Sequence, residues 1–425
     1  MHYRDIRNKF GGQHKGVIES ILSLSVLNGL KVLLPLITLP YLIRVVGIGK
    51  YGAYSIVYTI IQYVLLISAY GFNYTTTKLI AQSRDDSTRV NQIFYSTIFA
   101  RFLITIPAFL LFWVVIIFFY PQDYSLMYIG GIGMLIGDIL NPIWLFQGYE
   151  KMRYMTIATF LSKVLFTLLI FVCIQSESDY IYINVLNSLG YIISAVLSLY
   201  ISYKYFNIRR PYFNVQDIIF QLKDGWNVFL STIFMNFYRN SNIFILGFFV
   251  SEYGVGLYST AEKVIKAVQS LVAPVSNAFF PYYAASFKEN DESYNAKRVM
   301  SLNKKLFYAL LLLSAIVIAT SDLMNFFISG GADQRITWLI CLMTPVISIG
   351  GMNYILGIVG LVNLDYNKYF LKYVTISGLA SIITLLLTIH VGGIYSAAAS
   401  MILAEAVLFL CCYKRMRMIE SNCHK

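Results

Sequence analysis

The sequence predicts an all-α polytopic membrane protein of about twelve transmembrane helices, divided into two sets of six. Two features of its composition indicate this class: 58% of the 425 residues are hydrophobic and only 13% are charged. Soluble domains carry about 25% charged residues, so this chain is too apolar along its whole length to keep a hydrated surface. The third observation is the distribution of the basic residues, which indicates how the helices cross the membrane.

Apolar runs near the ~20 residues that a spanning helix requires recur in order along the chain. In the first half they cover residues 17–44, 53–77, 93–119, 126–148, 154–173 and 181–202. In the second half they cover residues 226–250, 254–285, 304–328, 336–361, 366–390 and 394–413. We therefore expect an N-terminal lobe over 17–206 and a C-terminal lobe over 225–418. A cytoplasmic linker over 207–224 would join them, with cytoplasmic ends at 1–16 and 419–425.

The basic residues support this order of spans. Only Arg44, Lys50 and Arg335 fall in the predicted outer segments, whereas the segments on the opposite side are rich in lysine and arginine. This asymmetry follows the positive-inside rule and places both termini in the cytoplasm. Most of the formal net charge of +12 therefore reflects membrane topology, and we expect no nucleic-acid partner.

The first outer turn contains GIGKYG at residues 47–52, which has the G-x-G-x-x-G spacing of a dinucleotide-binding turn. That fingerprint requires a strand before it and an acidic residue about 20 residues later, and both are missing here. The motif instead predicts a tight hairpin whose glycines permit positive φ and close helix packing. GAYS at 52–55 returns as GLYS at 256–259, each opening the second span of its half, which indicates duplicated halves.

Other kinds of site find no support in the sequence. The five cysteines show no C-x-x-C spacing and the four histidines are scattered, so we expect neither a disulfide framework nor a metal site. The predicted outer loops are too short to hold a catalytic domain. We expect no catalytic residue and no cofactor, and we expect the activity to lie within the bilayer or at its cytoplasmic face.

Ionisable residues deep in a span are costly and usually face a cavity or a partner. The clearest pattern lies on 254–285, where a polar stripe from Ser259 to Ser270 follows one helix face. Similar polar faces on other spans predict a central cavity with a cationic wall. The wall residues are Lys31, Arg239, Lys263 and Lys266, and the polar lining is Asn28, Gln62, Asn236, Asn240 and Glu262. Such a wall suits an anionic passenger, because lysine and arginine bind phosphate through charge-assisted hydrogen bonds.

The other deep charges have two interpretations. Asp138, Lys163 and Glu405 could form internal ion pairs, for example Asp138 with Lys163, or they could couple transport to a proton or sodium gradient. Glu262 is spaced to neutralise Lys266 one turn away. Arg101 and Lys372 lie near predicted cytoplasmic ends, where we expect them to anchor their helices by extending to the interface.

Three segments carry a resemblance to a known family: LPYLIRVVGIGKYGAYS at 39–55, NPIWLFQGYEKM at 141–152 and YGVGLYSTAEKVIK at 253–266. With the twelve spans and the basic N-terminus, the chain resembles bacterial polysaccharide flippases of the O-antigen (Wzx) type. These belong to the multidrug/oligosaccharidyl-lipid/polysaccharide exporter superfamily. The resemblance covers nearly the whole chain, and no individual binding residue is carried over from the family.

The resemblance implies two six-helix lobes around a central cavity. The implied passenger is an undecaprenyl-pyrophosphate-linked oligosaccharide, moved across the bacterial inner membrane by alternating access. The implied partners are this lipid-linked substrate, membrane lipids and other polysaccharide-assembly proteins.

Two other functions stay open at this point. A cation-coupled small-molecule exporter of the same superfamily would share the topology. However, organic cations favour acidic cavity residues, whereas bases outnumber acids here. A membrane glycan polymerase or glycosyltransferase would need a substantial outer loop, and the predicted outer loops are short.

Overall fold

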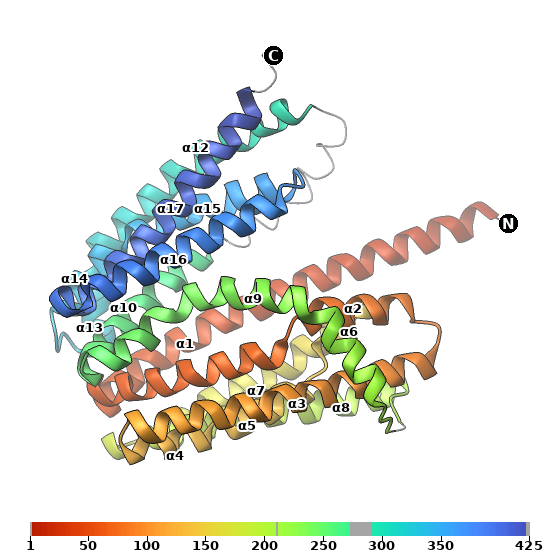
Figure 1. Ribbon diagram of the computed structural model, residues 1–425, viewed down its shortest axis with the longest axis horizontal. Coiled ribbons are helices and arrows are strands. Elements are labelled where there is room, and N and C mark those ends of the chain that lie inside the picture. Colours follow the sequence, from red (N-terminus) through yellow and green to blue (C-terminus); the bar gives the residue numbers. More distant parts are fainter. Residues whose placement is uncertain (1, 210, 273–290, 422–425) are drawn as a thin grey trace. The chain divides into compact units, whose positions relative to one another are not determined.

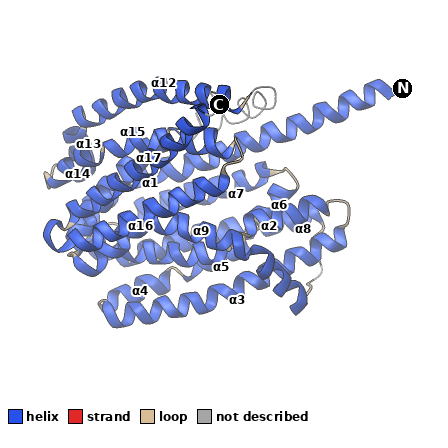
Figure 2. Ribbon diagram, turned by 45° about the horizontal axis from the view of Figure 1, so that its top comes forward, coloured by secondary structure: helices blue, strands red, loops and turns tan. Residues whose placement is uncertain are grey.

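The computed structural model of the chain describes residues 2–209, 211–272 and 291–421, with side chains omitted at 2–28, 30–33, 227, 231 and 234–240. Every regular element in these described ranges is a helix (Figures 1 and 2). The prediction of an all-helical, multi-span membrane protein is therefore confirmed.

The first half of the chain forms eight helices and one short 3₁₀ turn. They are α1 (His2–Ala69), α2 (Phe72–Gln82), α3 (Ser87–Phe119), α4 (Gln122–Gly130), α5 (Ile132–Leu140), α6 (Ile143–Gly148), α7 (Met152–Cys173), η1 (Glu177–Tyr182) and α8 (Ile183–Phe206). The predicted span 126–148 is thus divided among α4, α5 and α6. The break before α6 falls at Asn141–Pro142, where proline supplies no backbone N–H to continue the helix.

In the second half, the described helices begin inside the predicted linker. They are α9 (Val215–Phe249), α10 (Glu252–Ser270), α12 (Glu292–Ala319), α13 (Ser321–Ser329), α14 (Arg335–Met343), α15 (Pro345–Asn353), the π-helix η2 (Tyr354–Val362), α16 (Asn367–Gly392) and α17 (Ile394–Ser421). The predicted span 336–361 therefore corresponds to α14, α15 and η2 in succession.

Nine segments of the described chain are long and apolar enough to cross a membrane. One of them, Leu34–Gln82, joins the end of the predicted span 17–44 to the whole of 53–77. The predicted spans 226–250 and 254–285 fall on α9 and on α10 with the residues that follow it, where part of the chain lies outside the described residues. The number twelve, the central cavity and the cytoplasmic termini stay predictions.

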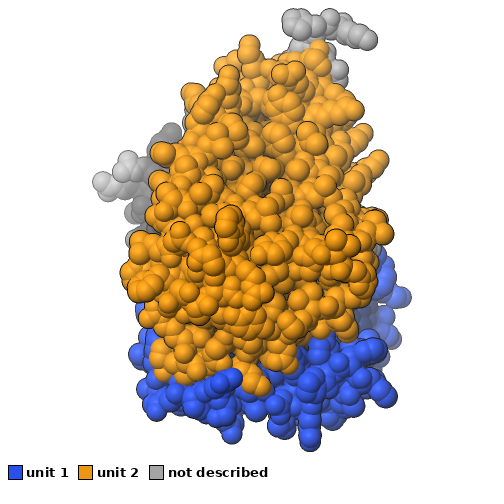
Figure 3. All heavy atoms as spheres, turned by 90° about the vertical axis from the view of Figure 1, so that its left-hand side faces the viewer, with its two compact units in different colours: residues 1–38, 57–233 blue, residues 39–56, 234–425 orange. Residues whose placement is uncertain are grey.

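The chain divides into two compact units, coloured separately in Figure 3. The N-unit comprises residues 1–38 and 57–233, and the C-unit comprises residues 39–56 and 234–425. The segment 39–56, which contains GIGKYG, thus packs within the C-unit although the chain on both sides of it belongs to the N-unit. We call this segment the inserted hairpin.

Close helix packing in the N-unit depends on small residues of α5. A Cβ on Gly137 would lie 2.5 Å from the backbone carbon of Tyr191 on α8, and one on Gly133 would lie 2.6 Å from the Ser188 side chain. Ser188 uses this proximity to donate a hydrogen bond to the Gly130 carbonyl, at 2.6 Å. Such small-residue contacts let membrane helices approach closely without a hydrophobic driving force.

The inserted hairpin turns at Gly47, the first glycine of the motif. Gly47 has φ 79° and ψ 160°, which interrupts the helical conformation of α1. Figure 1 shows that the chain reverses direction within α1. Only glycine adopts this backbone region readily. The predicted turn is therefore confirmed, although a single residue makes the break.

Gly47→Ala is expected to destabilise the protein by about 1–3 kcal/mol, because a side chain strains this backbone conformation. The expected measurement is a lower thermal unfolding midpoint for the purified protein. Gly49→Ala is the matched control, since Gly49 is helical and the nearest atom to its added Cβ would be 4.0 Å away. Equal midpoints for the two variants would contradict this role of Gly47.

Candidate functional site

The candidate site is built on α10, which carries the predicted polar stripe. Ser251 precedes the helix, and its hydroxyl accepts a hydrogen bond from the Gly254 amide, as N-cap residues do. Along the helix, Ser259 and Glu262 are buried, whereas Lys263 and Lys266 are half-buried. The two lysine side chains of the stripe are therefore more exposed than the glutamate side chain.

The two copies of the duplicated motif touch each other at their glycines. A Cβ on Gly52 would lie 1.8 Å from the Glu252 carbonyl oxygen, and a Cβ on Gly256 would lie 2.0 Å from the Ile48 carbonyl oxygen. Gly256 corresponds to Gly52 and Glu252 to Ile48 when the two motifs are aligned. The contact is thus reciprocal, as two related surfaces make across a two-fold axis.

This glycine contact brings Lys263 against two tyrosines of the inserted hairpin. The Lys263 ammonium donates a hydrogen bond to the Tyr51 hydroxyl. Its nitrogen also lies 4.8 Å from the Tyr51 ring centroid and 5.7 Å from that of Tyr54. Both tyrosines are buried, and aromatic faces attract a cation most strongly where water is excluded.

Lys266 has a carboxylate partner. Its ammonium lies 3.1 Å from the Glu262 carboxylate, one turn earlier on α10, as the spacing predicts. Glu262 also accepts a hydrogen bond from Tyr258 at 3.3 Å, and Tyr258 accepts one from Asn242 at 2.8 Å. This chain of contacts orients the acid and neutralises much of the charge of Lys266.

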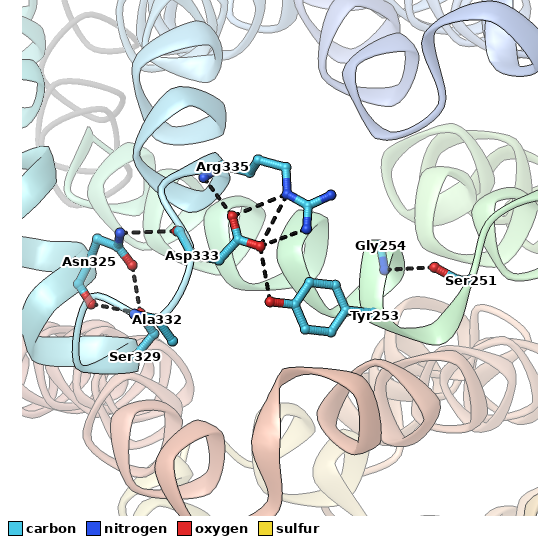
Figure 4. A network of polar contacts seen from close by, with 8 residues as sticks. All are labelled: Ser251, Tyr253, Gly254, Asn325, Ser329, Ala332, Asp333 and Arg335. Atoms are coloured by element: carbon cyan, nitrogen blue, oxygen red, sulfur yellow. Dashed lines mark hydrogen bonds and ion pairs between the residues drawn. The ribbon is translucent and has the colours of Figure 1, made fainter.

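Arg44 and Arg335, two of the three basic residues in the predicted outer segments, are held by contacts within the C-unit. Arg44 donates to the Phe326 and Phe327 carbonyls at 2.9 and 2.6 Å, where it caps the C-terminal end of α13. Arg335 and Tyr253 converge on Asp333, at 2.7 and 2.9 Å (Figure 4). The hydrogen bonds from Arg335 lower the pKa of the Asp333 carboxyl below its usual value. These contacts order the segment between α13 and α14.

Arg101 differs from its prediction. Its side chain is 5% exposed and does not extend to the interface. It forms an ion pair with Asp138, and it also donates to the Ser68 carbonyl at 3.1 Å and the Asp138 carbonyl at 2.7 Å. The sequence suggested Lys163 as the partner of Asp138, but the structure places Arg101 there. Asp138 pairs structurally, because a buried guanidinium is stable only with such partners.

The remaining predicted residues fall into three groups. Glu405 is buried in the C-unit and accepts hydrogen bonds from two amide side chains. Gln62 and Lys163 are half-buried in the N-unit, and the Gln62 amide nitrogen has no hydrogen-bond partner among the described residues. Five predicted residues lie outside the described side chains: Asn28, Lys31, Asn236, Arg239 and Asn240.

Sequence reasoning did not single out Tyr51, Tyr54 or Tyr258. The chain has 34 tyrosines, and composition alone does not distinguish those beside a lysine from those at the membrane interface. One sequence feature could have indicated two of them: Tyr54 and Tyr258 occupy the same position in the two copies of the duplicated motif.

The chain is similar to known membrane proteins along most of its length. Residues 17–287 match the family model described as "Polysaccharide biosynthesis protein". The chain is 27% identical over 371 residues to a protein of Escherichia coli (strain K12) named "Putative O-antigen transporter", a match that covers 86% of this chain and 88% of that one.

Two solved structures share its fold. The lipid II flippase MurJ in an inward closed conformation superposes with a TM-score of 0.75 at 14% identity, covering 95% of this chain and 90% of that one. An inward-facing multidrug resistance transporter of the MATE family superposes with a TM-score of 0.71 at 12% identity, covering 91% and 98%. These identities are too low to indicate more than a common architecture.

Proposed function

Because the chain belongs to the polysaccharide biosynthesis protein family, we propose that it is a flippase for a lipid-linked oligosaccharide. Its passenger would be an undecaprenyl-pyrophosphate-linked repeat unit of the O-antigen type, moved across the bacterial inner membrane by alternating access. The observation that carries the proposal is the match over 88% of the relative named "Putative O-antigen transporter". The relative and both solved neighbours carry the names of transporters or flippases, and the chain is a transporter rather than an enzyme.

The geometry of α10 supports an anionic, sugar-bearing passenger. Lys263 offers a cation beside the faces and hydroxyl of two tyrosines. A pyrophosphate would compete with Tyr51 for the ammonium through charge-assisted hydrogen bonds. Lys31, Arg239 and Lys266 stay in the proposal as further members of the cationic wall.

Lys263→Met is expected to lower surface polysaccharide about ten- to hundredfold in a strain that lacks the native gene. Methionine keeps an apolar stem of similar length but removes a charge-assisted contact worth about 1.5–3 kcal/mol. Lys372→Met is the matched control, because Lys372 is an exposed lysine on α16. Both variants should be present in the membrane at equal amounts, as checked by immunoblot. Wild-type polysaccharide from Lys263→Met would remove Lys263 from the site.

Lipid analysis of the strain that lacks the native gene distinguishes the proposed function from small-molecule export. Loss of a flippase leaves the lipid-linked repeat unit assembled but not moved, so mass spectrometry of extracted lipids should detect its accumulation. Loss of a small-molecule exporter would leave the level of this lipid unchanged. Accumulation that the wild-type gene reverses is the expected result.

A further inference from the structure

An arginine without an acidic partner lies where α16 and α17 reach the predicted cytoplasmic side of the C-unit. Arg415 of α17 is half-buried, and its guanidinium carbon lies 4.0 Å from the ring centroid of Tyr369 and 4.8 Å from that of Tyr366. Tyr366 directly precedes α16 and Tyr369 lies in its first turn, and α16 packs against α17. We call these three residues the arginine cluster.

The two rings attract the charge of Arg415 but leave its hydrogen-bond donors without acceptors. A guanidinium has five N–H donors, and an aromatic face supplies no acceptor oxygen. The Arg415 Nε is buried and has no hydrogen-bond partner among the described residues. Within the same part of the chain, no carboxylate oxygen lies within 4.0 Å of an Arg415 nitrogen. A buried charged donor without an acceptor is unfavourable, so the cluster is complete only with a further ligand.

Other arginines on the same predicted side of the membrane do have acidic partners. Arg84 lies 2.6 Å from the Glu150 carboxylate, and Arg89 lies 3.8 Å from that of Asp217. The missing partner is therefore a property of the place that Arg415 occupies, and it does not follow from the positive-inside rule alone.

The helices around the cluster are poor in acids. α16 contains no aspartate or glutamate, and α17 contains none from residue 406 to residue 418. Glu292 of α12 accepts a hydrogen bond from the Tyr366 hydroxyl at 3.1 Å, so this acid fixes the ring in place. Lys414 is exposed beside Arg415 and adds a second positive charge. These surroundings favour an anion from outside the chain.

The cluster lies at the depth of phospholipid headgroups. α17 begins at Ile394, and at about 1.5 Å per residue Arg415 is about 32 Å further along the helix. The hydrocarbon core of a bilayer is about 30 Å thick, so Arg415 is expected at the far boundary of that core. Tyr369 is 43% exposed, which leaves the cluster accessible from the surface of the C-unit.

We propose that Arg415, held by Tyr366 and Tyr369, binds the phosphate of an anionic phospholipid in the inner leaflet. The planar guanidinium would donate two parallel hydrogen bonds to phosphate oxygens. Lys414 would favour a headgroup with a net negative charge over a zwitterionic one, because basic pockets between helices on this side attract anionic lipids. The inference does not rest on the proposed flippase function.

Thermal unfolding of the purified full-length protein in a neutral detergent tests the site without any glycan. One series adds dioleoylphosphatidylglycerol, and a second adds dioleoylphosphatidylcholine, which has the same acyl chains and no net charge. A third adds inorganic phosphate at constant ionic strength. A ligand that binds the folded state raises the unfolding midpoint in a saturable way. We expect such a rise with phosphatidylglycerol, and we expect that neither of the other additions reproduces it.

Substitutions at two arginines of α17 locate the effect. Arg415→Gln should require at least about tenfold more phosphatidylglycerol for half of the rise, because it removes a charge-assisted contact. Arg415→Lys keeps the charge but loses the planar fork, and its response should fall between those of the wild type and Arg415→Gln. Arg417→Gln is the matched control. Arg417 is exposed on another face of the same end of α17, 5.5 Å from the Tyr413 ring. This control should keep the wild-type response.

Native mass spectrometry gives a reading that does not depend on stability. At equal lipid, the wild type and Arg417→Gln should each retain one more phosphatidylglycerol than Arg415→Gln. Equal titrations and equal retention for the wild type and Arg415→Gln would overturn the site. An equal rise with inorganic phosphate would overturn a lipid as the source of the phosphate, and an equal rise with phosphatidylcholine would overturn the preference for an anionic headgroup. Because surface polysaccharide is measured separately, failure of the flippase assignment would not be mistaken for failure of this site.

Discussion

Gly256→Ala is expected to reduce surface polysaccharide at least about fivefold, and Gly52→Ala should do the same. The added Cβ would lie 2.0 Å from the Ile48 carbonyl in the first variant and 1.8 Å from the Glu252 carbonyl in the second. Both obstacles are backbone atoms, which cannot rotate away as a side chain does. The inserted hairpin and α10 would have to separate, at a cost of about 1–3 kcal/mol.

The expected loss of activity follows from alternating access. Under the alternating access proposed above, a contact between duplicated segments that formed in only one state would set the balance between the two states. A cost of about 1–3 kcal/mol confined to one state shifts the balance between states about 5- to 150-fold. The variants should therefore reach the membrane in normal amounts and fail in transport.

Gly49→Ala is again the control, because its added Cβ would have no neighbour closer than 4.0 Å. Complementation of a strain without the native gene measures transport through surface polysaccharide. Immunoblots of membrane fractions measure the amount of each variant in the membrane. If Gly256→Ala and Gly49→Ala support equal polysaccharide, the reciprocal glycine contact has no part in transport. If Gly256→Ala is absent from the membrane, the contact acts in folding instead.

Arg101→Leu is expected to have the largest effect on stability, about 3–5 kcal/mol. Removing the guanidinium leaves the half-buried Asp138 carboxylate without its partner, and breaking one side of a buried pair costs this much. It also leaves the Ser68 carbonyl without the hydrogen bond that it accepts at 3.1 Å. The thermal unfolding midpoint and the yield of purified protein should both fall.

A double-mutant cycle isolates the ion pair. Arg101→Leu combined with Asp138→Leu should recover most of the lost stability, because hydrophobic replacements of a buried pair are often neutral. The remaining deficit should be about 1–3 kcal/mol, from the unsatisfied Ser68 carbonyl. Lys372→Leu is a control, since Lys372 is exposed. A double mutant as unstable as Arg101→Leu alone would show that the pair is not the source of the effect.

Local patterns made part of the molecule predictable. The glycine of the first hairpin and the ion pair between Glu262 and Lys266 both follow from spacings of a few residues. The breaks inside two predicted spans were harder to foresee, because their apolar composition continues across Pro142 and Pro345. Hydropathy measures the length of a span, whereas the missing proline N–H decides where its helix is interrupted.

Contacts between distant segments could not be predicted in this way. The partner of Asp138 is 37 residues away and that of Lys263 is 212 residues away. Depth along a helix suggested that Arg101 would reach the interface, but depth does not tell which side of the helix faces protein. The tyrosines around Lys263 could not be predicted for the same reason, since their contact with the lysine depends on how the inserted hairpin packs.

The sequence by itself determined that this is a helical membrane protein, because solvation by lipid requires long apolar helices and leaves a readable excess of basic residues on one side. It also carried the duplicated motif that the family resemblance shares. Only the tertiary structure decided which charges are neutralised and which are not. Lys266 meets Glu262 and Asp138 meets Arg101, whereas Glu405 accepts hydrogen bonds from the amides of Gln269 and Asn353. Compensation of a buried charge depends on distances of a few ångströms between helices, and the linear order of residues does not contain those distances.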